Sequence, residues 1–158
     1  MDFEVVRSTK RRRTVQARQI GDRVRVSIPA TMTKAEEERW VTEMVRRMER
    51  KALADAVDLP ARAEALGTRH GFPRPASIRW VDNQQFRWGS CTPADGSIRI
   101  STRVGSFPRW VLDYVVVHEL AHLRVGGHGP DFWALVARYP LAERARGFLI
   151  AKGGEDQD

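Results

Sequence analysis

Polar and apolar side chains alternate in two early segments, residues 13–20 and 23–29. Alternation with a period of two is typical of strands that bury one face and expose the other. The two segments are separated by Gly21-Asp22, a pair that favours a two-residue hairpin turn. The pattern therefore predicts an N-terminal β-hairpin.

The pattern changes to a helical period after the hairpin. From Thr33 to about Val57 the apolar residues recur every three or four positions, with acidic residues early and basic residues later. Thr33 is a suitable N-cap. We expect a long helix whose inner face carries Trp40, Met44, Met48 and Leu53. A second, shorter helix is predicted over residues 60–69, beginning at Pro60 and ending before Gly71.

The second half of the chain reads as short strands followed by helices. The last two of the three predicted strands are joined by a turn at Pro93–Gly96. The predicted strands span residues 77–82, 85–91 and 97–101, and helices begin near Pro108, Pro130 and Pro140. This order predicts an α+β fold with a short antiparallel sheet. The length predicts one domain over residues 1–152, followed by a polar tail at 153–158.

The helix that begins at Pro108 carries a pattern typical of a metal site. His118 and His122 are four residues apart, so they point the same way from a helix, with Glu119 beside them. Catalytic zinc sites commonly use three protein ligands and leave one position open. His128 is the nearest candidate for the third ligand, because a glycine at 126–127 can reverse the chain towards the metal.

The context of this motif favours a buried active-site helix. Three of the four histidines of the chain lie within residues 118–128. Apolar residues surround the motif, namely Val115, Val116, Val117, Leu120, Ala121 and Leu123. The alternative is a core helix whose histidines bond internally and whose Glu119 lies on a solvated edge.

Composition places the chain among ordinary globular proteins. It has 158 residues, a net charge of +7 and one cysteine, Cys91, which excludes an internal disulfide. No apolar run is long enough to span a membrane, and the first residues lack an apolar signal core. The expected compartment is the cytoplasm, and the sequence sets no oligomeric state.

The positive charge is concentrated near the N-terminus. Residues 1–51 hold 14 Lys and Arg against 8 Asp and Glu, which gives +6, and the densest run is Lys10–Arg13. Such a run can bind nucleic acid, but it can also be a solvated surface, and no aromatic residue lies within it to stack on a base. A second hypothesis is therefore a zinc-stabilised binding module whose basic N-terminal region contacts nucleic acid or an acidic partner.

Several motifs taken together resemble those of a known family. Arg87-Trp-Gly-Ser-Cys91, Gly96-Ser-Ile-Arg-Ile100, Asp113–Leu123, His128 and Phe132-Trp133 are similar to the YgjP-like metallopeptidase domain, which is related to the SprT-like and WLM groups of minimal zincins. The resemblance implies a compact zincin fold in an intracellular bacterial protein. It also implies one zinc ion bound by His118, His122 and His128, with Glu119 as catalytic base. The chain departs from the family pattern at Ser101, Val104 and Phe148.

The leading hypothesis is metal-assisted hydrolysis of a protein or peptide substrate. Glu119 would act as general base on a zinc-activated water. A second oxyanion donor is expected, and Tyr114, Tyr139 and His70 all remain candidates. The strand at 97–101 would bind an extended substrate through Ile98, Arg99 and Ile100 if it forms the sheet edge.

The segment Trp88–Cys91 has two further interpretations. Ser90 or Cys91 could be a nucleophile with a histidine base, but the histidines with supporting context are already assigned to the metal. The favoured interpretation is a tight, packed corner in which Cys91 is a small buried group.

Overall fold

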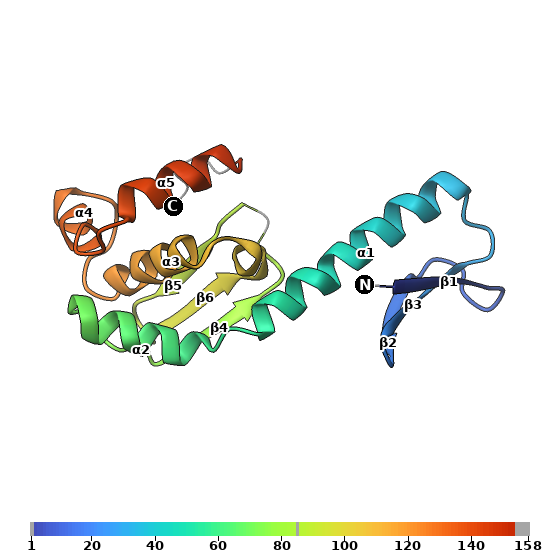
Figure 1. Cartoon of the computed structure of the whole chain (residues 1–158), viewed down its shortest axis with the longest axis horizontal. Helices are drawn as coiled ribbons and strands as arrows, with labels where there is room; N and C mark the ends of the chain where they lie inside the picture. The colour runs from blue at the N-terminus through green and yellow to red at the C-terminus, as the bar shows by residue number, and fades with distance from the viewer. Residues whose placement is uncertain (1, 85, 154–158) are drawn as a thin grey trace. The chain divides into compact units, whose positions relative to one another are not determined.

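The computed structural model describes residues 2–84 and 86–153. The chain divides into two compact units, Met1–Ala52 and Leu53–Asp158 (Figure 1). The sequence predicts one domain over residues 1–152, and this stays a prediction. Apart from Gly153, the predicted polar tail lies outside the described residues.

The first unit contains a three-stranded sheet in the order β1-β3-β2. Its strands are β1 (Asp2–Ser8), β2 (Gln16–Ile20) and β3 (Arg23–Pro29). The predicted hairpin is confirmed, because β2 and β3 pair antiparallel and Gly21 takes a φ of 63° in the turn between them. The sequence did not predict β1, which pairs parallel to β3 from the other side.

Helix α1 (Lys34–Asp55) follows this sheet. Thr33 and Glu36 form a capping box, in which each side chain accepts a hydrogen bond from the backbone N–H of the other residue. In the first unit the face of α1 that packs on the sheet carries Val41, Val45 and Met48. The expected inner positions of Trp40 and Leu53 were wrong, since 39% and 51% of these residues are exposed.

The second unit contains a sheet in the order β4-β6-β5. Its strands are β4 (Ser77–Val81), β5 (Gly89–Thr92) and β6 (Ser97–Ser101). The expected antiparallel sheet was wrong, because β4 runs parallel to β6 and only β5 runs antiparallel to it. Strand β6 lies between the other two, so β5 and β4 form the edges.

The helices of the second unit surround α3, which occupies its centre. These elements are α2 (Leu59–His70), the 3-10 helix η1 (Thr102–Ser106), α3 (Arg109–His122), α4 (Pro130–Val136) and α5 (Ala142–Ala151). Asp58 caps α2 by accepting from the N–H of Ala61, and Gly71 ends it with a φ of 78°. Helices α2 and α3 lie on one face of the β4-β6-β5 sheet (Figure 1).

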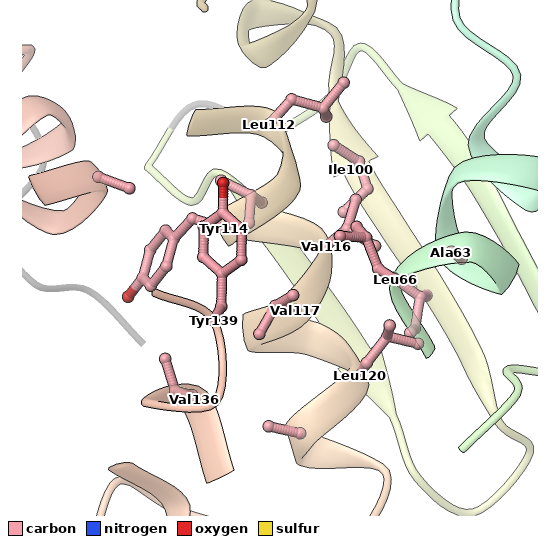
Figure 2. Packing of buried hydrophobic residues seen from close by; sticks show 14 of the residues in the cluster. Ala63, Leu66, Ile100, Leu112, Tyr114, Val116, Val117, Leu120, Val136 and Tyr139 are labelled. Atoms are coloured by element: carbon pink, nitrogen blue, oxygen red, sulfur yellow. The ribbon is translucent and has the colours of Figure 1, made fainter. Parts of the chain in front are cut away.

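The main hydrophobic core forms on both sides of α3. Figure 2 shows Leu112, Val116 and Leu120 directed towards Ile100 of the sheet and towards Ala63 and Leu66 of α2. On the other side, Tyr114 and Val117 face Val136 and Tyr139 from the C-terminal segment (Figure 2). Helix α3 is therefore held from two directions, which fixes the position of any side chain that it presents.

The two sheets and the helices confirm the predicted α+β class. Among the residues described, no helix is both long and apolar enough to cross a membrane.

Candidate functional site

The predicted motif lies on a helix that is buried along most of its length. Every residue of α3 from Val111 to Ala121 is buried. The helix ends at His122, four residues before the glycine pair where the sequence predicted its end. Gly127 has a φ of 70°, so a glycine does take the left-handed conformation that brings the chain back to His128.

The structure brings the three predicted ligands together. The ligand nitrogens of His118, His122 and His128 all lie within 4.8 Å of one another. The Nε2 atoms of His122 and His128 are 3.0 Å apart. Two nitrogens bound to one tetrahedral zinc ion at about 2.0–2.1 Å would stand roughly 3.3 Å apart, so this spacing fits a shared metal. The three histidines can therefore hold one metal ion.

The other ring nitrogens of two of these histidines have partners of their own. The Nδ1 atom of His122 lies 3.1 Å from the carbonyl oxygen of Val125. The Nδ1 atom of His118 lies 3.3 Å from the hydroxyl of Tyr114, which is one helical turn earlier. The carbonyl of Val125 can only accept, so it places the proton of His122 on Nδ1 and leaves Nε2 as the ligand atom, whereas the Tyr114 hydroxyl orients the His118 ring.

An apolar wall surrounds the histidine cluster. The ring of Phe132, which is fully buried, stacks on His122 with a centroid distance of 4.3 Å. Phe132 also meets the rings of His118 and His128 edge-on, at 4.9 Å and 4.8 Å. Trp133 adds a second ring about His118 and His128, at 6.1 Å and 5.9 Å. This wall excludes water from one side of the metal position and restricts the rotamers of its ligands.

Glu119 lies on the side of α3 that faces strand β5. Only 4% of this residue is exposed. A Cβ atom added to Gly89 would stand 3.0 Å from Glu119 Oε1 and 3.1 Å from its Cγ, so any larger residue here would force the carboxylate to shift by a few tenths of an ångström. The backbone of β5 therefore forms one wall of the site.

Cys91 lies two residues further along β5 and is half-buried. Burial, together with the negative charge of Glu119, raises the pKa of its thiol to about 11. A thiol with this pKa is protonated at neutral pH and is a poor nucleophile. The observation favours the packed-corner interpretation of Trp88–Cys91.

An ion pair between Arg62 and Asp113 anchors α3, and it was not predicted from the sequence. Asp113 is 5% exposed, and its Oδ1 atom accepts from Arg62 Nε of α2 at 2.6 Å while Oδ2 accepts from the adjacent NH2. This hydrogen bonding raises the pKa of the Arg62 guanidinium. An acidic residue within the apolar run of α3 was the available signal, but its partner lies 51 residues away.

One of the three candidate oxyanion donors, Tyr139, is hydrogen-bonded to another group. The hydroxyl of Tyr139 donates to the carbonyl oxygen of Trp110 at 2.8 Å, and burial raises its pKa to about 12. His70 packs edge-on against the ring of Tyr139 at 5.8 Å. Tyr114 remains beside the metal site through its contact with His118.

The predicted substrate strand does not form the sheet edge. Strand β6 is paired on both sides, and Ile98 and Ile100 are fully buried against the helices. Strand addition at Ile98, Arg99 and Ile100 was therefore the wrong expectation. The edge strand next to Glu119 is β5.

Comparisons with known proteins agree with this arrangement. The model of the YgjP-like metallopeptidase domain matches residues 6–149. The crystal structure of the metallopeptidase zymogen of Pyrococcus abyssi abylysin is similar to this chain, with 21% identity and a TM-score of 0.54, covering 61% of this chain and 95% of that one. The metallopeptidase zymogen of Methanocaldococcus jannaschii jannalysin is also similar, with 19% identity, a TM-score of 0.52, and coverage of 61% and 97%. No curated protein matches the chain. At these identities the two structures show a shared fold.

Proposed function

The chain belongs to the YgjP-like metallopeptidase family, and we propose that it is a peptidase whose zinc ion is held by His118, His122 and His128. The convergence of three histidine nitrogens beside a buried glutamate carries this proposal. Imidazole ligands suit zinc, and three of them leave a position open for the reaction. One zinc ion per chain is expected.

Bound zinc would supply a Lewis acid that lowers the pKa of a water molecule and polarises the scissile carbonyl group. Glu119 is the residue we assign as general base. It is adjacent to His118 in sequence, and its carboxylate lies against the backbone of Gly89. A carboxylate held in this way accepts a proton from the attacking water and passes it to the leaving amine.

The substrate would lie along strand β5. The backbone N–H of Ser101 donates to the carbonyl oxygen of Trp88, so Trp88 and Ser101 form a hydrogen-bonded pair of the antiparallel ladder. The pattern alternates, and Gly89 and Cys91 therefore direct their backbone N–H and C=O groups away from β6. An extended peptide can pair with these groups and place a peptide bond beside Glu119.

The deciding experiment replaces the base and keeps the ligands. Glu119→Gln should abolish peptide hydrolysis by the zinc-loaded protein and leave the zinc content at one ion per chain. Glu143→Gln is a matched control, because Glu143 is exposed and lies in the first turn of α5. Substantial hydrolysis by the Glu119→Gln protein would show that another group is the base.

A further inference from the structure

The second face of the β4-β6-β5 sheet is polar. Ile98 and Ile100 of β6 point towards α3, so Ser97 and Arg99 point to the opposite face. Ser90 of β5 pairs with Arg99 and Thr92 pairs with Ser97, which places both hydroxyl side chains on the same polar face. Gly89 and Cys91, by contrast, lie on the face of Glu119.

The guanidinium of Arg99 extends from the central strand over the edge strand. Its Nε donates to Ser90 Oγ at 2.8 Å, and its Nη2 donates to Thr92 Oγ1 at 2.8 Å. Its Nη1 donates to Ser97 Oγ at 3.2 Å. The side chain is therefore fixed above β5, although its Cα belongs to β6.

Neutral hydroxyls are the partners that hold this charge. Within residues 2–84 and 86–153, no carboxylate forms an ion pair with Arg99. The nearby Asp95 accepts from the backbone N–H and the hydroxyl of Ser97, at 2.9 Å and 2.6 Å, and its charge also interacts with that of Arg99 without a direct hydrogen bond. Arg79 of β4 lies directly opposite Arg99 and is exposed, so it adds positive charge to the same face. The two guanidinium groups of this face thus outweigh the charge of Asp95, which forms no direct ion pair with Arg99.

The hydroxyls beside Arg99 are positioned to donate. Ser90 Oγ accepts from both Arg99 Nε and Gln84 Nε2, the latter at 2.8 Å, so its own hydrogen is directed elsewhere. Thr92 Oγ1 also accepts from Arg99 and retains its hydrogen. A guanidinium with two hydroxyl donors suits a ligand group that only accepts hydrogen bonds, and an ionised carboxylate is such a group.

A peptide paired with β5 would bring such a group to this position. Paired strands lie about 4.8 Å apart, and residues directly opposite each other direct their side chains to the same face. Peptide residues opposite Ser90 and Thr92 would therefore project onto the polar face, within reach of the Arg99 guanidinium. Residues opposite Gly89 and Cys91 would project towards Glu119.

We propose that Arg99, Ser90 and Thr92 form a subsite for acidic side chains of an extended peptide substrate, on the face of β5 opposite to Glu119. This subsite rests on the strand pairing of the proposed function. It predicts that the enzyme prefers Glu or Asp at every second residue on one side of the chain, while the intervening residues contact the metal side. Arg99 thus contributes to substrate selection through its side chain and not through its backbone.

The test measures binding separately from hydrolysis. Three fluorescein-labelled pools of degenerate peptides are compared, identical except that every second residue is Glu, Gln or Lys. Anisotropy titrations use the zinc-loaded Glu119→Gln protein, which should bind without cleaving. The Glu pool should bind about tenfold tighter than the Gln pool, and the Lys pool weakest, as expected for a charge-assisted contact. Equal affinities, or no binding of any pool, would overturn the subsite.

Further substitutions, made in the Glu119→Gln protein, test whether Arg99 causes the preference for the Glu pool. Arg99→Gln should reduce the difference between the Glu and Gln pools to within twofold. Arg99→Lys keeps the charge without the planar fork and should retain a smaller preference for Glu. Arg109→Gln removes the same charge from an exposed position at the start of α3 and should leave the preference intact. A full preference for Glu in the Arg99→Gln protein would reject the assignment, and thermal melts confirm that each variant is folded.

Hydrolysis of the same pools by the wild-type protein is scored on its own. Failure to cleave any pool counts against the peptidase proposal, whereas the binding titrations still decide the subsite. Cleavage of all three pools at equal kcat/KM, with equal binding, would support the peptidase and reject the subsite.

Discussion

Gly89 lies so close to Glu119 that a methyl group at position 89 would stand 3.0 Å from the carboxylate oxygen Oε1. The same methyl group would meet the carbonyl oxygen of Arg99 at 3.2 Å, so it could not move away along the sheet. The carboxylate must therefore shift if any side chain is added to this position of β5.

Gly89→Ala should lower kcat for peptide hydrolysis by up to about tenfold, because the carboxylate must move by a few tenths of an ångström and a catalytic base is sensitive to its position. Zinc content should be unchanged, since the histidines do not contact Gly89. Gly147→Ala is the control: a Cβ there meets nothing within 4 Å, so activity should be retained. Wild-type activity in Gly89→Ala would show that Glu119 tolerates the shift or is not the base.

Removal of one metal ligand should lower the zinc content of the protein. His128→Ala should retain far less zinc than the wild type after exhaustive dialysis, as measured by elemental analysis, because two histidines remain of the three that converge. His70→Ala should keep one zinc per chain, since His70 packs on Tyr139 and is not one of the three converging histidines. If His128→Ala keeps all of its metal, His128 is not the third ligand.

Zinc binding should also stabilise the folded protein and depend on pH. Zinc at a free concentration one hundred times its dissociation constant would add about 2.7 kcal/mol to the free energy of unfolding. Because zinc binding requires deprotonated imidazole ligands and releases their protons, this gain should be smaller in acidic buffers. Thermal melts with and without a chelator, at several pH values, measure both effects. A melting temperature that does not change when the chelator is added would contradict the prediction.

Asp113→Asn should destabilise the protein by about 1–3 kcal/mol, because it leaves the Arg62 guanidinium without its carboxylate in a partly buried position. Urea unfolding measures the change. Glu64→Gln removes a carboxylate from the exposed ion pair with Arg74 and should change stability by less than about 0.5 kcal/mol. Equal effects of the two substitutions would mean that the Arg62–Asp113 pair does not anchor α3.

Cys91 should react slowly with iodoacetamide. Its pKa is raised from 9.0 to about 11, so at pH 8 the thiolate fraction is one to two orders of magnitude below that of the unfolded chain. The labelling rate of the folded protein should keep rising up to about pH 11. The same raised pKa means that the contribution of Cys91 to the free energy of unfolding is lost as the pH rises from 9 to 11. Rates in urea provide the reference. Rapid labelling of the folded protein at pH 8 would reopen the nucleophile hypothesis.

The binding-module alternative predicts a salt-dependent affinity for DNA. Arg12 and Arg13 are exposed in the loop between β1 and β2. If this region binds phosphates, replacing Arg12 and Arg13 with Gln should lower the slope of the logarithm of the DNA-binding constant against the logarithm of the salt concentration by about 2. Replacing Arg79 and Arg109 with Gln removes the same charge elsewhere and should leave the slope unchanged. An absence of binding at low salt would reject the alternative.

The features that the sequence predicted well are local in the chain. The capping box at Thr33 and the αL glycine after α2 depend on residues within a few positions of one another. The spacing of His118, Glu119 and His122 fixes their relative directions as soon as a helix forms. The hairpin β2-β3 belongs to the same class, because a two-residue turn sets its register.

The predictions that failed depend on contacts between distant residues. The parallel pairing of β4 with β6 places Ser77 opposite Ser97, although β5 lies between these two strands in the sequence. No local pattern distinguishes this arrangement from a meander. The central place of β6 follows from that pairing and removed the expected substrate edge. Trp40 satisfies a helical period but is exposed, because the sheet of its unit packs on the turn that carries Val41.

The sequence by itself determined which chemical groups the candidate site offers, since His118, Glu119 and His122 have fixed relative directions on one helix and His128 follows six residues after His122. Tertiary structure alone decided which strand lies beside them. Gly89 meets Glu119, Arg62 meets Asp113 and the Arg99 guanidinium reaches over β5 only after the sheet and helices have packed. The physical reason is that helix geometry is set by bonds four residues apart, whereas strand order and interhelical ion pairs are set by the burial of apolar faces from the whole chain.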